Sequence, residues 1–185
     1  MTRRARLGAA LGLAVAAAGA AAAVPRAGPS HAGQGGWQEI RWPFPRDAWP
    51  AGRAFRCTGT ACGGATEVYV RPKVGFCNCA TGVSGDAEVD GVSDLDMISP
   101  DFRPLAAGEP VTAGGMPGRV RRYVLTIGDG RKHMAAGFTL SAKCDLIAAA
   151  ALGRAAGTDA TRDAILALLA RPGVAGWIGS KLGKA

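Results

Sequence analysis

Alternating hydrophobic and polar residues predict short β-strands along the chain before residue 142. Val68 and Val70, for example, share one face of the segment 66–71. Gly63-Gly64 and Gly128-Asp129-Gly130 supply turns, and glycine permits the positive φ angles that tight hairpins need. The predicted strands are 37–42, 53–57, 66–71, 119–127 and 131–141. The last four of these are expected to form two β-hairpins.

The C-terminal part of the chain has helical spacing instead. An alanine-rich segment, 144–154, follows a candidate N-cap at Ser141, and a second segment runs from Thr158 or Asp159 to residue 171. A short helix is predicted at 174–182. Because strands come first and helices last, the expected fold class is α+β. We predict a small antiparallel sheet built from hairpins, with two or three C-terminal helices packed on it.

The start of the chain has the pattern of an export signal. Three arginines within the first six residues precede an uncharged Ala/Gly/Leu/Val stretch, 7–24. Ser30-His31-Ala32 offers small residues for signal peptidase, which makes Gly33 the expected first residue of the mature protein; cleavage after Ala23 is the alternative. The stretch is too rich in alanine and glycine for a membrane anchor. Residues 1–32 are therefore interpreted as a signal peptide.

The expected product is a single disulfide-stabilised domain over residues 33–185, periplasmic or secreted, with no transmembrane anchor after cleavage. The general secretory route is favoured over twin-arginine export, because Arg6 occupies a position that is usually apolar in twin-arginine signals. The formal net charge of the whole chain is +8, and the leader supplies about half of it. A nucleic-acid partner is therefore not expected.

Five cysteines downstream of the leader indicate disulfide bonds in an oxidising compartment. Cys57 and Cys62 lie at the end of the first predicted hairpin, and the segment between them contains glycine and can curl, so a local bond is expected. Cys144 is expected to bond to Cys77 or Cys79, which would tie the following helix to the sheet. One cysteine then remains over, and the sequence does not decide which.

Cys77, Cys79 and Cys144 also support an alternative function as redox thiols. On an extended strand Cys77 and Cys79 point to the same face, and a bond between them would be strained and would exchange readily with other thiols. Cys144, predicted in the first turn of a helix, would have a lowered pKa there. With His133 or a methionine as a further ligand, the Cys77 and Cys79 sulfurs would also suit cuprous copper.

A partial calcium-loop pattern lies in the middle of the chain. Asp86, Glu88 and Asp90 occupy the first, third and fifth positions of an EF-hand-like loop. Met97 stands at the twelfth position, where calcium needs a bidentate glutamate. The favoured interpretation is an acidic, solvated turn or short helix. No cofactor is predicted, and copper and calcium remain alternatives.

Basic residues cluster on the second hairpin, at positions 119, 121, 122, 131 and 132. They could contact anionic lipid headgroups or another envelope polymer, but charges on an edge strand also prevent aggregation, and we favour this second explanation. Enzyme chemistry is poorly supported. His133 is the one histidine after the leader, and the sequence contains neither a Gly-x-Ser-x-Gly elbow nor a Cys-x-x-Cys motif.

Three segments resemble those of an uncharacterised family of small exported bacterial proteins: 42–50 (WPFPRDAWP), 52–57 (GRAFRC) and 71–79 (RPKVGFCNC). The resemblance covers most of the mature chain and implies an exported protein, without implying an activity. The expected function is a binding or accessory role in the cell envelope, toward an unknown envelope protein or ligand. A thiol-disulfide or copper-handling role is the alternative.

Overall fold

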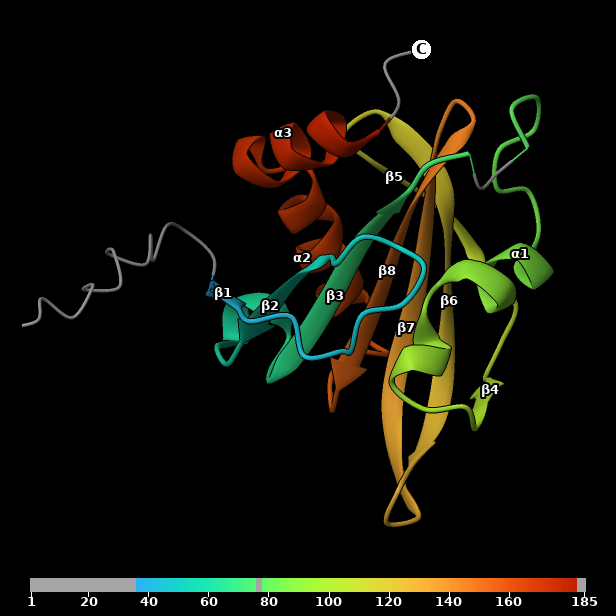
Figure 1. Ribbon diagram of the computed structural model, residues 1–185. Helices are drawn as coiled ribbons and strands as arrows, with labels where there is room; N and C mark the ends of the chain where they lie inside the picture. The colour runs from blue at the N-terminus through green and yellow to red at the C-terminus, as the bar shows by residue number, and fades with distance from the viewer. Residues whose placement is uncertain (1–35, 76–77, 183–185) are drawn as a thin grey trace, which may run out of the picture.

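A computed structural model describes residues 36–75 and 78–182 (Figure 1). The strands are β1 (Trp37–Ile40), β2 (Arg53–Cys57), β3 (Thr66–Lys73), β4 (Phe102–Pro104), β5 (Glu109–Ala113), β6 (Met116–Ile127), β7 (Arg131–Ala142) and β8 (Asp145–Gly153). The helices are α1 (Asp86–Val92), α2 (Asp159–Leu169) and α3 (Pro172–Lys181), with short 3₁₀ helices η1 (Thr60–Cys62) and η2 (Leu95–Met97). The predicted α+β class is confirmed, and the predicted leader lies outside the described residues.

All strands belong to one antiparallel sheet with the order β1-β2-β3-β8-β7-β6-β4, and β5 also pairs with β6. Both predicted hairpins are present as β2–β3 and β6–β7. The α2 helix begins at Asp159, as the sequence predicted. The Thr158 hydroxyl caps this helix by accepting a hydrogen bond from the Thr161 N–H. Among the described residues, no helix is long and apolar enough to cross a membrane.

The alanine-rich segment 144–154 is not a helix, which corrects the sequence-based prediction. It forms β8, in the middle of the sheet between β3 and β7, and seven of the nine β8 residues are buried. A strand covered on both faces is apolar throughout, so its sequence lacks the alternation that distinguishes strand from helix. Cross-strand pairing here overrides the helix propensity of alanine. The turn before β8 places Lys143 at a φ of 58°.

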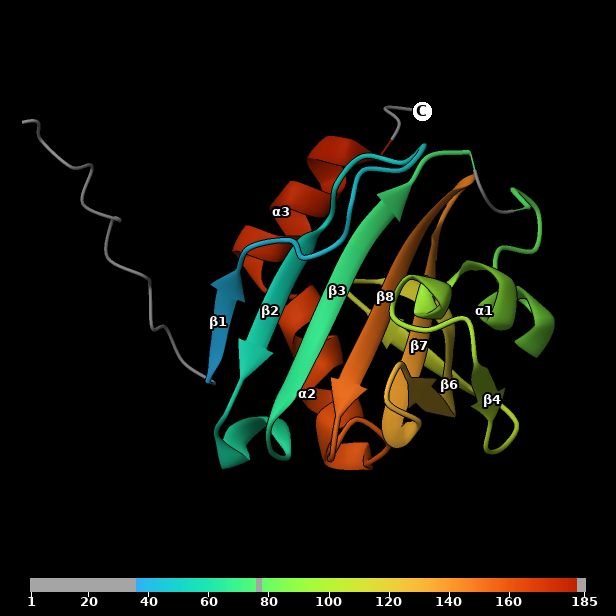
Figure 2. The same cartoon turned by 60° about the horizontal axis from the view of Figure 1, so that its bottom comes forward.

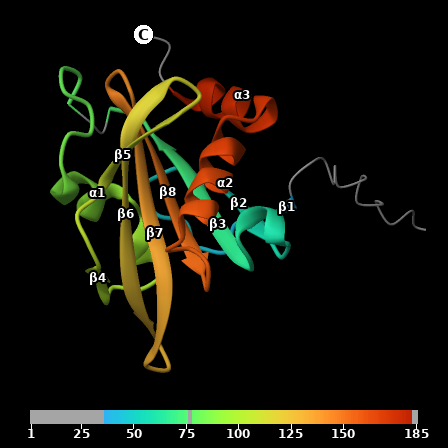
Figure 3. The same ribbon diagram turned by 180° about the vertical axis from the view of Figure 1, so that it is seen from behind.

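Side chains on the two faces of the sheet form two cores (Figures 2 and 3). On one face, α2 and α3 pack over alternate residues of β3, β7 and β8, with Phe138, Ile165 and Leu168 almost fully buried. On the other face, the segment 41–52 and the α1–η2 region cover Tyr69, Tyr123 and their neighbours. The helices that complete the fold therefore lie on opposite sides of one sheet.

Gly137 of β7 allows the α1–η2 region to pack directly on the sheet. A Cβ atom added at Gly137 would lie 2.6 Å from the Ser93 hydroxyl oxygen and 2.7 Å from the Ser93 Cβ. Ser93 and the following Asp94 are both buried. The lack of a side chain at Gly137 thus lets Ser93 pack against the sheet and keeps the neighbouring Asp94 buried. The buried position of Asp94 matters for the site described below.

Candidate functional site

Two disulfides lie in different environments. Cys57 and Cys62 are joined next to the β2–β3 hairpin and are 1% and 0% exposed, within the core under the helices. Cys79 is joined to Cys144, and both residues are exposed. Cys144 lies in the turn before β8 and not in the first turn of a helix, which corrects the sequence-based prediction. Cys77 lies outside the described residues.

The acidic residues of the calcium-like pattern lie on α1, and each carboxylate already has partners. Asp86 accepts hydrogen bonds from the Gly108 N–H at 2.9 Å and from Arg119 at 2.6 Å. These bonds, led by that of Gly108, hold the pKa of Asp86 below its ordinary value. Asp90 accepts from Arg121 at 2.7 Å and from the Tyr123 hydroxyl at 2.6 Å.

Glu88 caps the first turn of α1 by accepting hydrogen bonds from the N–H groups of Ser84 and Gly85, and these bonds lower its pKa. His133 lies on β7 near the hairpin turn. Within residues 36–75 and 78–182, no three histidine, cysteine or acidic side chains gather in an arrangement that could hold a metal ion. The weak metal candidates therefore do not come together in this part of the chain.

The basic cluster of the second hairpin is divided between the two faces of β6. Arg119 and Arg121 point toward α1, whereas Arg122 points to the opposite face and pairs with Glu109 and Asp159. The β6 strand pairs with β7 on one side and with β4 and β5 on the other, so it is not an edge strand. Protection of an edge is therefore the wrong explanation, and three of these arginines serve to join β6 to neighbouring helices.

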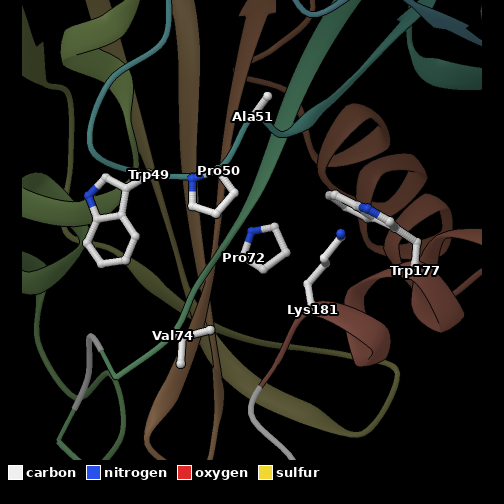
Figure 4. Close-up of a pocket in the computed structure, with 7 residues that line it drawn as sticks. All are labelled: Trp49, Pro50, Ala51, Pro72, Val74, Trp177 and Lys181. Carbon is white, nitrogen blue, oxygen red and sulfur yellow. The ribbon is translucent and has the colours of Figure 1, made fainter.

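A pocket of about 120 Å³ lies where β3, α3 and the segment before β2 meet (Figure 4). Its lining consists of Trp49, Pro50, Ala51, Pro72, Val74, Trp177 and Lys181. We call it the Trp49–Trp177 groove. Pro50, Ala51, Val74 and Lys181 are exposed, so the groove is open to solvent along one side. Its surface is nearly all apolar, and sequence analysis did not identify it.

The Trp177 wall of the groove is held by Arg53. The Arg53 guanidinium lies 5.4 Å from the centre of the Trp177 ring, a cation–π distance, and it donates a 3.3 Å hydrogen bond to the Gly173 carbonyl at the start of α3. Glu39 of β1 pairs with Arg53 from the other side. Through these contacts β1 and β2 fix the position of α3, and with it the Trp177 side chain.

The Trp49 wall is held by a buried ion cluster on the opposite face of β3. The Asp47 carboxylate accepts the Trp49 N–H at 2.9 Å and Arg71 at 2.6 Å. Arg71, only 3% exposed, also makes two hydrogen bonds to Asp94, of 2.9 and 2.8 Å. Asp94 pairs in addition with Lys73 at 2.6 Å, and the Lys73 ammonium lies 5.8 Å from the Trp49 ring centre.

This ion cluster was also missed by sequence reasoning, although one signal was present. Arg71 and Lys73 are two apart in a strand, so they share a face, and two cations beside buried apolar residues require anionic partners. Their partners lie far along the chain, and Asp94 adopts a φ of 63°, which few residues other than glycine tolerate. Only folding places the Asp94 carboxylate beside both cations.

Asp47 should make a pH-dependent contribution to stability. The hydrogen bond from Arg71 holds the pKa of Asp47 below its ordinary value of 3.8. A depressed folded-state pKa stabilises the protein above the unfolded value, and this contribution is lost as the pH falls through the folded value. We expect the urea midpoint of Asp47→Asn to lie below that of the wild type at pH 7 and to approach it below about pH 4. A constant difference down to pH 2 would contradict this role.

The sequence matches no protein-family profile and no curated protein. Among solved structures, it is similar to PA94, a protein of unknown function from Pseudomonas aeruginosa that is proposed as a regulator. The identity is 14% and the TM-score is 0.40, over 75% of this chain and 99% of that one. A likeness of this size identifies neither a family nor a function.

Proposed function

We propose that this chain is a small exported protein with a binding or accessory role in the cell envelope, and that the Trp49–Trp177 groove is its binding site. The leader-like sequence at 1–32 and the two disulfides support export, because such bonds persist in oxidising compartments. The groove is the single observation that supports binding. Tryptophans from distant segments line the two ends of one apolar pocket, with Pro50 and Pro72 between them, and each ring lies close to a cation (Figure 4).

The size of the groove favours a particular kind of ligand contact. Its volume of about 120 Å³ is close to that of an apolar cavity that holds benzene and below that of pockets that enclose whole small molecules. It therefore accepts one apolar group of a larger ligand, with the remainder of that ligand outside. A few buried contacts, often with aromatic side chains such as tryptophan, contribute most of the binding energy at recognition sites. One ionisable side chain, Lys181, contributes to the lining.

Titration with 1-octanol, followed by tryptophan emission, tests the binding role. Saturable binding is expected, because burial of each CH₂ group contributes about 0.8 kcal/mol. Trp177→Ala should weaken it by about fivefold or more through loss of one wall, with Trp49 still reporting the binding. Leu105→Ala is the matched control, because Leu105 is a 52% exposed apolar residue next to β4, at the opposite edge of the sheet.

A second variant separates binding from folding. Val74 is 53% exposed and lines the groove, so Val74→Gln places an amide there without disturbing the core. It should weaken octanol binding while leaving the melting temperature within a degree or two of the wild type. If neither Trp177→Ala nor Val74→Gln changes the emission titration, the groove is not the binding site.

A thiol-disulfide or copper-handling role is a second candidate, favoured by the exposure of Cys79 and Cys144. An exposed disulfide is accessible to an attacking thiolate, whereas the buried Cys57–Cys62 bond is not. Alkylation and mass spectrometry of the purified protein in graded dithiothreitol test this role. It requires the Cys79–Cys144 bond to open while the protein stays folded, or the reduced protein to bind one equivalent of cuprous ion. An inert bond and no copper binding would exclude it.

A further inference from the structure

Three cations lie in or next to the lining of the Trp49–Trp177 groove. Lys181 lines the groove itself, Arg53 lies behind the Trp177 ring, and Lys73 lies behind the Trp49 ring. Figure 4 shows the Lys181 side chain ending between Pro72 and Trp177, and Lys181 is exposed, so its ammonium group lies on the solvent-facing side of the apolar pocket. An apolar pocket with a cation on its solvent-facing side is complementary to an apolar group that carries an anion.

The neighbouring acids are already used by other cations. Glu39 pairs with Arg53, Asp47 pairs with Arg71, and Asp94 pairs with both Arg71 and Lys73. Within residues 36–75 and 78–182, no carboxylate pairs with Lys181. Among the described residues, the positive charge of Lys181 is thus the one in the lining of the groove that a ligand could neutralise.

The adjacent strand edge is unsuited to a peptide that adds as a strand. The β2–β3 pairing ends at Val70, which leaves the last part of β3 without a partner on that side. The Val70 carbonyl points toward Gly52, and main-chain groups two residues apart in a strand point to the same edge. The main chain of Pro72 therefore faces the unpaired edge, where proline has no N–H to donate. Recognition here therefore depends on an apolar group and a charge, and not on main-chain hydrogen bonds.

We propose that the groove binds a single-chain carboxylate amphiphile of the fatty-acid type, with the apolar chain against Pro50, Pro72 and Trp177 and the carboxylate on the Lys181 ammonium. This inference rests on the proposed binding function and adds the ligand class to it. Lys181 would then act beyond its structural role in the last turn of α3, where a cation is favoured by the helix dipole.

A comparison of octanoate with 1-octanol in wild type and Lys181→Gln tests this proposal. The two probes share a chain length and differ in charge, so the ratio of their Kd values isolates the charge. At low salt, the Kd for octanol divided by the Kd for octanoate should be about two- to fivefold larger in the wild type than in Lys181→Gln. This is the range expected for a partly exposed ion pair. The preference should decrease as the salt concentration rises.

Lys132→Gln is the matched control, because it removes an equal charge from an exposed lysine near the β6–β7 turn, at the end of the sheet away from α3 (Figure 1). It should leave the ratio unchanged. The melting temperature of Lys181→Gln should stay within about two degrees of the wild type, since the variant loses one exposed dipole interaction. These controls separate a ligand contact from a general effect of net charge or stability.

The possible outcomes distinguish the proposal from the function on which it rests. If octanol binds but octanoate shows no dependence on Lys181, the fatty-acid proposal is rejected and the binding function stands. If N-acetylleucine binds more tightly than octanoate with the same dependence on Lys181, the ligand is the C-terminus of a polypeptide and the proposal is again rejected. If none of the three probes binds, the proposed function itself fails.

Discussion

Asp94→Asn should lower the free energy of unfolding by about 3 to 5 kcal/mol, the usual cost of breaking a buried ion pair. The Asp94 carboxylate holds Arg71 through two hydrogen bonds and also pairs with Lys73, and all three residues are at most 6% exposed. Asparagine keeps the shape and tolerates the same positive φ, so the backbone strain is unchanged. The variant therefore measures the charge.

Urea unfolding of Asp94→Asn, followed by circular dichroism, gives this value. Asp96→Asn, two residues away and exposed, is the matched control and should change stability by less than about 0.5 kcal/mol. The Asp94 variant should also alter the emission of Trp49, because Asp94 positions Arg71, which in turn holds Asp47 beside Trp49. Equal stability of the two variants would show that the cluster does not depend on this carboxylate.

Loss of the long disulfide should have an effect of similar size. Cys79 and Cys144 are 65 positions apart in the chain, and closure of a loop of this length stabilises a protein by about 4 kcal/mol in the chain-entropy description. Cys144→Ser should lower the free energy of unfolding accordingly, and the Cys79→Ser/Cys144→Ser double variant should lower it by the same amount, because one bond is lost in both.

Cys77→Ser is the control for this experiment, since the bonds Cys57–Cys62 and Cys79–Cys144 do not involve Cys77. It should leave the melting temperature nearly unchanged. The measurement is thermal unfolding without reductant, combined with mass spectrometry to count alkylated thiols. If Cys77→Ser destabilises the protein as much as Cys144→Ser does, the bonding pattern is different from the one described.

Some elements could be predicted because their signals are local. The Gly128–Gly130 turn, the alternation in β3 and the Thr158 cap depend on residues close together in the sequence. The helical prediction for β8 was wrong because alanine favours helices locally, and burial between β3 and β7 is a property that only the assembled sheet has.

The ion cluster shows the same limit at the level of single side chains. Arg71 and Lys73 are neighbours on one strand, so their shared face could be predicted. Asp47 and Asp94 lie 24 and 23 positions from Arg71, and nothing in their local sequence identifies them as its partners. The position of Asp94 depends on the close packing of Ser93 against Gly137, which no periodic pattern reveals.

By itself, the sequence determined the hairpins, the last two helices, the α+β class and the supply of cysteines, because backbone conformation follows local spacing and turn residues. Only the tertiary structure decided that residues 145–153 form a strand, which acids pair with the buried cations, and that the Trp49–Trp177 groove exists. These features join segments far apart in the chain, and burial and charge pairing arise only when such segments meet.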